Sequence, residues 1–68
     1  MTEISKEARD LLVEVSIWAR PVEDYKPEIV AELLAAGLVW FGEQFSHRKG
    51  RFVKMMVISG HGTERLAS

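Results

Sequence analysis

Residues 38–58, LVWFGEQFSHRKGRFVKMMVI, decide the fold of this 68-residue chain. Two apolar segments, rich in β-branched, aromatic and Met residues, flank the polar break Ser46–Gly50. This pattern is typical of a β-hairpin with a basic tip. Along the return strand, Phe52–Ile58, neither face is cleanly polar, so we expect helices to cover one face and to leave the other partly exposed.

The segment before the hairpin predicts two helices. Apolar residues recur at three- and four-residue steps over about residues 5–19, in a helix that Ser5 can cap and that Pro21 must end. The second half of this helix also carries Val13 and Ile17 away from the main apolar stripe. We therefore expect that a second layer of the protein, or a partner, covers them.

The second helix is expected over about residues 27–36. Pro27 suits the first position of a helix, and Gly37 suits the left-handed residue that follows a helix end. Leu38 would then fold back on Leu33, as in a Schellman motif.

Two short segments complete the pattern. Arg20–Lys26 is expected to be a connector in which Tyr25 packs against Val30. After the hairpin, Ser59 is expected to cap one last short helix, or a frayed turn of one.

The composition is that of one folded domain spanning residues 1–68. Hydrophobic residues make up 47% of the chain and charged residues 28%, a balance typical of folded rather than disordered proteins. A chain of this length has no room for a second core or a cofactor-binding βαβ unit, which excludes most enzyme classes. The N-terminal residues lack the pattern of a secretory signal, and no apolar stretch has the length of a membrane span. We therefore expect a cytoplasmic protein with no membrane partner.

The formal net charge of −1 is the sum of two parts of opposite sign. Residues 1–44 hold four basic and nine acidic side chains, which gives −5. Residues 45–68 hold five basic side chains against Glu64 alone, which gives +4. The positive part is concentrated on the predicted hairpin, whose basic side chains are His47, Arg48, Lys49, Arg51 and Lys54.

Three sequence features in the second half of the chain occur in a characteristic order. The segment Leu34–Val39 closes the second helix, the basic hairpin follows, and Ile58–Ser59 with Gly62 opens the last segment. Residues 27–66 thereby resemble the C-terminal half of the winged helix-turn-helix domain of MarR-type transcriptional regulators, with Ile58–Ser59 in place of the family's Leu-Thr pair. The resemblance implies a small α+β fold of the winged-helix type, with two helices followed by a β-hairpin wing and a short C-terminal turn or helix.

The resemblance also implies a small DNA-associated regulatory protein whose wing contacts the nucleic-acid backbone. In such a fold a helix N-terminus enters the major groove, and a cationic loop tip contacts phosphates. The five basic hairpin residues would be the contacts to double-stranded DNA, and each would steepen the salt dependence of binding. A basic tip equally well keeps a hairpin edge from pairing with other chains, so this alternative stays open.

Two features depart from the family pattern. Only Arg20–Lys26 is available for the helix that normally precedes the recognition helix, so that helix is shortened to a turn or missing. The outward positions of the second helix include Glu28, Ala31, Glu32 and Ala35, which are unsuited to reading base edges. We therefore expect any DNA contact to come from the wing.

No residue pattern indicates catalysis, a cofactor or a metal site. His47 and His61 have no neighbours at ligand spacing, and no serine lies in a nucleophile motif. We expect neither an enzyme nor a small-molecule substrate. Most of the large aromatic side chains are expected to fill the core, rather than to form a stacking platform for single strands. These side chains are Trp18, Trp40, Phe41, Phe45 and Phe52.

A second hypothesis is a protein-interaction module that binds a partner, or a second copy of itself, without binding DNA. The basis is the excess of apolar residues on so short a chain. Val13 and Ile17 on the first helix, or the exposed face of the hairpin, would form the contact. Burial of Val13 and Ile17 inside the monomer would remove the basis for this hypothesis.

Overall fold

Three α-helices and a three-stranded antiparallel sheet make up the computed structural model, which describes residues 4–67. In chain order the elements are α1 (Lys6–Ile17), β1 (Arg20–Pro21), the 3₁₀ turn η1 (Val22–Asp24), α2 (Pro27–Ala35), β2 (Val39–Ser46), β3 (Arg51–Ile58) and α3 (Gly60–Ala67). The strand order is β1-β3-β2. The predicted α+β class is confirmed, whereas the ends of the predicted domain, residues 1–3 and 68, lie outside the described part.

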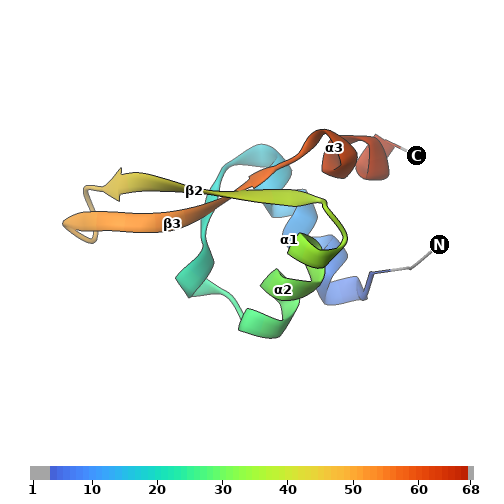
Figure 1. Cartoon of the computed structure of the whole chain (residues 1–68), viewed down its shortest axis with the longest axis horizontal. Helices are drawn as coiled ribbons and strands as arrows, with labels where there is room; N and C mark the ends of the chain where they lie inside the picture. The colour runs from blue at the N-terminus through green and yellow to red at the C-terminus, as the bar shows by residue number, and fades with distance from the viewer. Residues whose placement is uncertain (1–3, 68) are drawn as a thin grey trace.

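The helices gather at one end of the molecule (Figure 1). α1 and α2 lie on one side of the sheet, and α3 follows the base of the hairpin. The β2–β3 hairpin projects in the opposite direction, away from both chain ends. The molecule is accordingly elongated, with extents of 40 × 21 × 16 Å.

α1 begins where the sequence predicts. Ser5 Oγ accepts a hydrogen bond from the Ala8 N–H at 3.2 Å, which caps the helix. The helix ends at Ile17, short of the expected residue 19, because Trp18 is already extended and leads into β1. Glu32 of α2 accepts hydrogen bonds from the Ser5 N–H at 2.6 Å and from the Ser5 hydroxyl at 2.9 Å, which joins the start of α1 to α2.

The end of α2 is the predicted Schellman motif. Gly37 has a φ of 71°, and its N–H donates to the Leu34 carbonyl at 3.0 Å. The Leu38 N–H donates to the Leu33 carbonyl, also at 3.0 Å. Leu33 and Leu38 are both buried. The turn therefore directs the chain into β2. The last carbonyls of α2 accept hydrogen bonds, and Leu38 is buried as the apolar residue that the motif requires.

The connector Arg20–Lys26 holds more structure than predicted. Arg20 and Pro21 form β1, which pairs with Met56 and Met55 of β3, and η1 follows directly. A two-residue strand is too short to show alternation, which is why periodicity could not reveal it.

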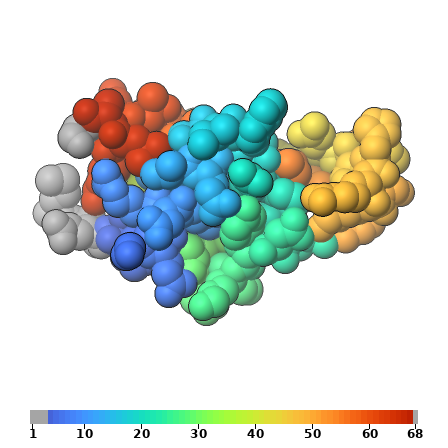
Figure 2. Space-filling model, turned by 180° about the vertical axis from the view of Figure 1, so that it is seen from behind, coloured from blue at the N-terminus to red at the C-terminus, as the bar shows by residue number. Residues whose placement is uncertain are grey.

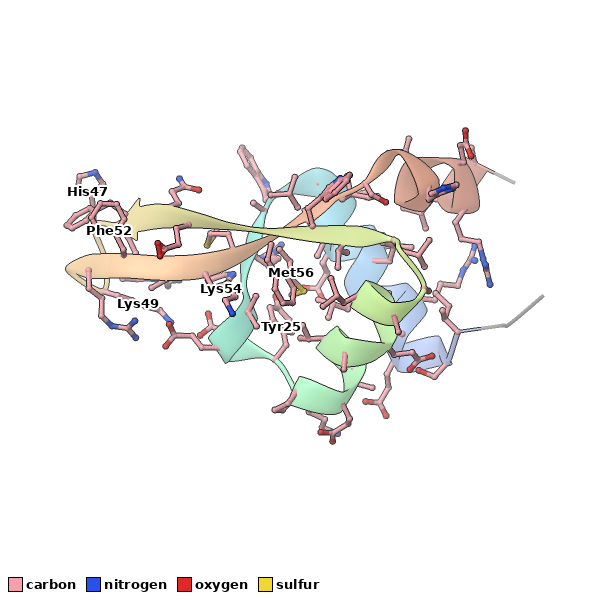
Figure 3. All side chains as sticks on the ribbon, viewed as in Figure 1. Tyr25, His47, Lys49, Phe52, Lys54 and Met56 are labelled. Atoms are coloured by element: carbon pink, nitrogen blue, oxygen red, sulfur yellow. The ribbon has the colours of Figure 1, made fainter. Side chains whose placement is uncertain are left out.

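The core lies between the sheet and the first two helices. Its buried side chains are Ala8, Leu11, Leu12, Val15, Val30, Leu33, Leu38, Val39 and Met56. Met56 points from the sheet toward α2, and Tyr25 packs against this cluster, which contains its predicted contact Val30 (Figure 3). No member of the cluster is aromatic.

The expectation that most of the large aromatic side chains fill the core is wrong. The exposed fractions are 71% for Trp18, 64% for Trp40, 36% for Phe41, 42% for Phe45 and 66% for Phe52. Each hairpin strand has eight residues, and the helices cover only the base of the hairpin. Trp18 lies just beyond the end of α1. Both tryptophans and all three phenylalanines therefore lie outside the layer that the helices and the sheet enclose.

Ser59 joins several elements at the base of the hairpin. Its hydroxyl accepts a hydrogen bond from the Gly62 N–H at 3.0 Å and donates one to the Gly37 carbonyl at 2.8 Å. Its own N–H donates to the Leu38 carbonyl at 3.0 Å. The predicted cap is confirmed, and α3 is a helix rather than a frayed turn.

We predict that Gly62→Ala destabilises the fold while Gly60→Ala does not. A Cβ at position 62 would lie 2.6 Å from Ile58 Cγ1 and closer still to the Leu38 carbonyl oxygen, whereas a Cβ at position 60 meets no atom within 4 Å. Gly62→Ala should lower the free energy of unfolding by about 1–3 kcal/mol through overpacking. Gly60→Ala should leave it within about 0.5 kcal/mol. Urea denaturation measures both, and equal stability of the two variants would contradict the close approach.

Candidate functional site

The predicted basic residues lie on the outer part of the hairpin. β2 and β3 pair in antiparallel register from Val39↔Ile58 to Ser46↔Arg51, and His47–Gly50 close the turn. Gly50 has a φ of 69°, and its N–H donates to the Ser46 carbonyl at 2.7 Å. The tip is therefore a hydrogen-bonded turn that fixes the directions of the side chains around it.

One side of the tip is aromatic. Phe45 and Phe52 are opposite each other in the register, and their rings meet edge to face with centroids 5.4 Å apart. His47 meets Phe45 in the same way at 5.3 Å. Figure 3 shows His47 and Phe52 together at the far end of the hairpin. Closer to the base, Lys54 Nζ lies 5.3 Å from the centre of the Phe41 ring, a cation–π contact.

Two of the predicted phosphate contacts are paired with carboxylates of η1. Lys49 Nζ lies 2.9 Å from Asp24 Oδ1 and 3.3 Å from Glu23 Oε2. Arg51 Nη2 lies 2.7 Å from the same Glu23 oxygen. Lys49 points from the tip toward η1 (Figure 3). We call these contacts the tip–η1 pairs; their two positive and two negative charges cancel.

The tip–η1 pairs change the titration of two of these groups. The hydrogen bond from Arg51, and after it the one from Lys49, holds the pKa of Glu23 below its ordinary value. The hydrogen bond to Asp24, and after it the one to Glu23, raises the pKa of Lys49. Both shifts favour the charged forms of Glu23 and Lys49.

Arg48 is the tip cation that has no carboxylate beside it. It is exposed, and no acidic side chain within residues 4–67 pairs with it. Lys54, by contrast, lies opposite Glu43 in the register. The fold thus carries the five basic residues on one hairpin but pairs two of them, Lys49 and Arg51, with carboxylates.

The exposed side of α2 carries no cation. Glu28, Ala31 and Ala35 are exposed as predicted, whereas Glu32 is half-buried through its hydrogen bonds to Ser5. The sequence of α2, PEIVAELLA, contains no Lys or Arg. This surface repels phosphate groups.

Val13 and Ile17 are exposed, by 43% and 66%. At about 100° of rotation per residue, they lie on the side of α1 opposite the buried Leu11 and Val15. Trp18 adds a third large apolar side chain at the helix end, and we call these three residues the α1 patch. Figure 2 shows α1 at the surface of the molecule, between α3 and the hairpin. Since no second layer from the described part of the chain covers Val13 and Ile17, the basis for an interaction role stands.

Glu23 and Asp24 are the residues of this site that sequence reasoning missed. They lie 28 and 25 positions from Arg51 and Lys49. The sequence indicates this pairing only through the opposite charges of Glu23 and Asp24 and of Lys49 and Arg51. These charges can be matched to one another only when the connector is known to run beside β3.

Within residues 4–67, no cluster of three or more His, Cys, Asp or Glu side chains is arranged to hold a metal ion. None of the helices in this part of the chain combines the length and the apolar character needed to cross a membrane. No family model, curated protein or solved structure matches the sequence or the fold. The function therefore has to be inferred from the residues and the structure of this chain.

We predict that acid loosens the hairpin tip. Because the pKa of Glu23 is lowered in the folded protein, its stabilising contribution is complete above the ordinary carboxylate pKa and is lost as the pH falls through the lowered value. Amide hydrogen-exchange protection in residues 46–51 should therefore decrease on acidification, while that of core amides in α2 does not.

The variant Glu23→Gln is the control for this prediction. It should show the weaker protection of residues 46–51 already at neutral pH and little further change in acid. Protection that is independent of pH in the wild-type protein would contradict a stabilising role of the tip–η1 pairs.

Proposed function

We propose that this chain is a winged-helix-like interaction module that binds a partner protein through exposed apolar side chains. The observation that carries the proposal is that both tryptophans and all three phenylalanines are exposed. Monomeric soluble proteins rarely expose large apolar patches unless these bind something. Aromatic residues are also enriched at the centres of protein interfaces.

The order of the elements supports the winged-helix part of the proposal. The hairpin follows α2 directly, and β1 pairs with β3 on the side away from β2. η1 lies between α1 and α2, where the MarR-type domain has a further helix, as the shortened element that the sequence predicts. Because one fold can serve different functions, the chemistry of its surface has to identify the partner.

The α1 patch is the part of this surface best suited to a protein partner. Val13 and Ile17 stand on a helix whose opposite side is anchored in the core, and Trp18 follows directly after it. Asp10 and Glu14, both exposed, flank them on the same helix. An apolar centre with a charged margin on a rigid element is the usual composition of a protein interface.

Site-specific photo-crosslinking in the cells that produce the chain tests this proposal. A photoreactive amino acid at Ile17 or Val13 should yield a discrete crosslinked protein, because both side chains point into the proposed contact. The same substitution at Ala31, which is exposed on α2, is the matched control and should yield none. Absence of an adduct at both α1 positions, or the same adducts from Ala31, would contradict the proposal.

Contact with the backbone of double-stranded DNA is a second candidate function. The observation that favours it is Arg48, which is exposed at the end of a projecting hairpin and has no carboxylate partner within residues 4–67. Exposed ion pairs contribute only about 0–1 kcal/mol, so Lys49 and Arg51 can exchange their carboxylates for phosphates at small cost. The carboxylates of η1 would still lie close to the phosphates and repel them. Such binding would be weak and independent of sequence.

We predict that Glu23→Gln/Asp24→Asn increases the affinity for duplex DNA at low salt. Loss of the two carboxylates frees Lys49 and Arg51. The slope of log K against log salt concentration should then steepen by about 0.9 for each freed cation that reaches a phosphate. Fluorescence anisotropy with a labelled duplex, repeated over a salt series, measures both quantities.

Two further variants complete this experiment. Asp10→Asn/Glu14→Gln removes the same two charges from α1 and should leave the slope unchanged. Arg48→Ala/Lys49→Ala should weaken binding about equally for all sequences. If neither the wild-type protein nor Glu23→Gln/Asp24→Asn shows salt-sensitive binding, the DNA candidate is excluded.

A further inference from the structure

β2 forms a long open edge of the sheet. It has eight residues, whereas the strand at the other edge, β1, has two. Every residue from Trp40 to Phe45 is exposed, and within residues 4–67 no strand lies beyond β2. An open edge presents a row of unpaired N–H and C=O groups, which another strand can pair with.

β2 lacks the features with which proteins usually protect an edge strand. Lysines, prolines, bulges and covering elements are the common ones. β2 contains no Lys, Arg or Pro, and its register with β3 runs without a bulge from Val39↔Ile58 to Ser46↔Arg51. Glu43 is its one charged residue. The basic residues of the hairpin lie in the turn and on β3, so they do not protect this edge.

We infer that β2 pairs antiparallel with β2 of a second copy of this chain, which joins the two sheets into one. The inference goes beyond the proposed function, because the contact lies at the edge of β2 and not at the α1 patch. A two-fold axis perpendicular to the sheet keeps the helices of both copies on the same side. With this axis, each residue and the residue opposite it in the second copy point to the same face of the joined sheet. The two residue numbers then have an even sum, and at the axis one residue lies opposite its own equivalent in the second copy.

Charge and overlap select the residue at the axis. An axis at Glu43 would place two carboxylates directly opposite each other, which is destabilising. An axis at Phe41 or Gln44 would overlap a shorter part of the strand, residues 39–43 or 42–46. An axis at Gly42 overlaps residues 39–45 of both copies and avoids opposed like charges. Gly42 is therefore the residue expected at the axis.

The surroundings of Gly42 suit this position. It has no side chain where the two copies come closest, and an added Cβ would meet no atom of its own chain within 4 Å. In this register Trp40 lies opposite Gln44 of the second copy, and Phe45 lies opposite Val39. The pairing would cover part of the aromatic surface that the monomer exposes at Trp40 and Phe45.

The absence of cysteine from the chain allows a direct test with Gly42→Cys. Directly opposed residues in an antiparallel pair have Cα atoms about 4.5–5.5 Å apart, within the range of a disulfide. At micromolar concentration with oxidised glutathione, Gly42→Cys should form a disulfide-linked dimer. Thr63→Cys, exposed on α3, is the control and should form no disulfide-linked dimer. Wild-type protein should sediment at twice the mass of one chain.

A charge exchange tests the register without a cysteine. Trp40→Glu/Gln44→Lys places opposite charges across the axis twice, and Trp40→Lys/Gln44→Lys places like charges there. Within one copy the two positions are about 13 Å apart along the strand, so the variants differ mainly between copies. The dissociation constant of the dimer should be about tenfold lower for the first variant.

The outcomes separate this inference from the proposed function. A monomeric wild-type protein whose Gly42→Cys variant crosslinks no faster than Thr63→Cys overturns the self-pairing. Equal dissociation constants of the two charge variants overturn it as well. In either case the interaction module stands if photo-crosslinking at Ile17 yields a discrete adduct, and both proposals fall if it does not.

Discussion

The hydrogen bonds of Ser59 are the constraint on which the rest of the structure depends. A serine hydroxyl can donate one hydrogen bond and accept others, so one side chain can serve two helix ends. Ser59 donates to Gly37 after α2 and accepts from Gly62 in the first turn of α3. Its N–H pairs with Leu38 at the entrance to β2. Groups that helix ends leave unpaired are thereby satisfied at one point.

This junction explains the shape of the molecule. It fixes both strands of the hairpin at the base, where Leu38, Val39 and Met56 enter the aliphatic core. The strands then continue for longer than the helices can cover, and Phe45 and Phe52 near the tip stay exposed. The outer part is attached to the body by the tip–η1 pairs, which are partly exposed and therefore weak. The base of the hairpin is thus fixed by buried contacts and the hydrogen bonds of Ser59, whereas its tip is held by weak ion pairs.

Local chemistry made much of this fold predictable from the sequence. The caps at Ser5 and Ser59, Pro27 at a helix start and Gly37 at a helix end each act over a few residues, so sequence spacing reveals them. The exposure of Phe45 and Phe52 near the tip depends instead on how far the hairpin extends beyond the helices, which no local pattern encodes. The pairing of Glu23 with Arg51 depends on η1 running beside β3. The sequence therefore predicted the basic residues of the candidate site, but it did not predict the carboxylates that pair with two of them.

The charge division along the chain has a different meaning in the folded protein. Parts of −5 and +4 would give a basic surface if they stayed apart in space. The fold instead places Glu23 and Asp24 of the acidic part against Lys49 and Arg51 of the basic part. Two of the cations that would have attracted phosphates, Lys49 and Arg51, are compensated within the chain, whereas Arg48 stays exposed.

The position of the tip–η1 pairs leaves the open edge of the sheet unaffected. η1 follows β1 and contacts β3, so the pairs form on the side of β3 away from β2 (Figure 1). The same tether that neutralises the basic tip therefore does not obstruct the edge of β2. Because the two lie on opposite sides of β3, weakening the tether is expected to change the electrostatics of the tip without removing the pairing surface.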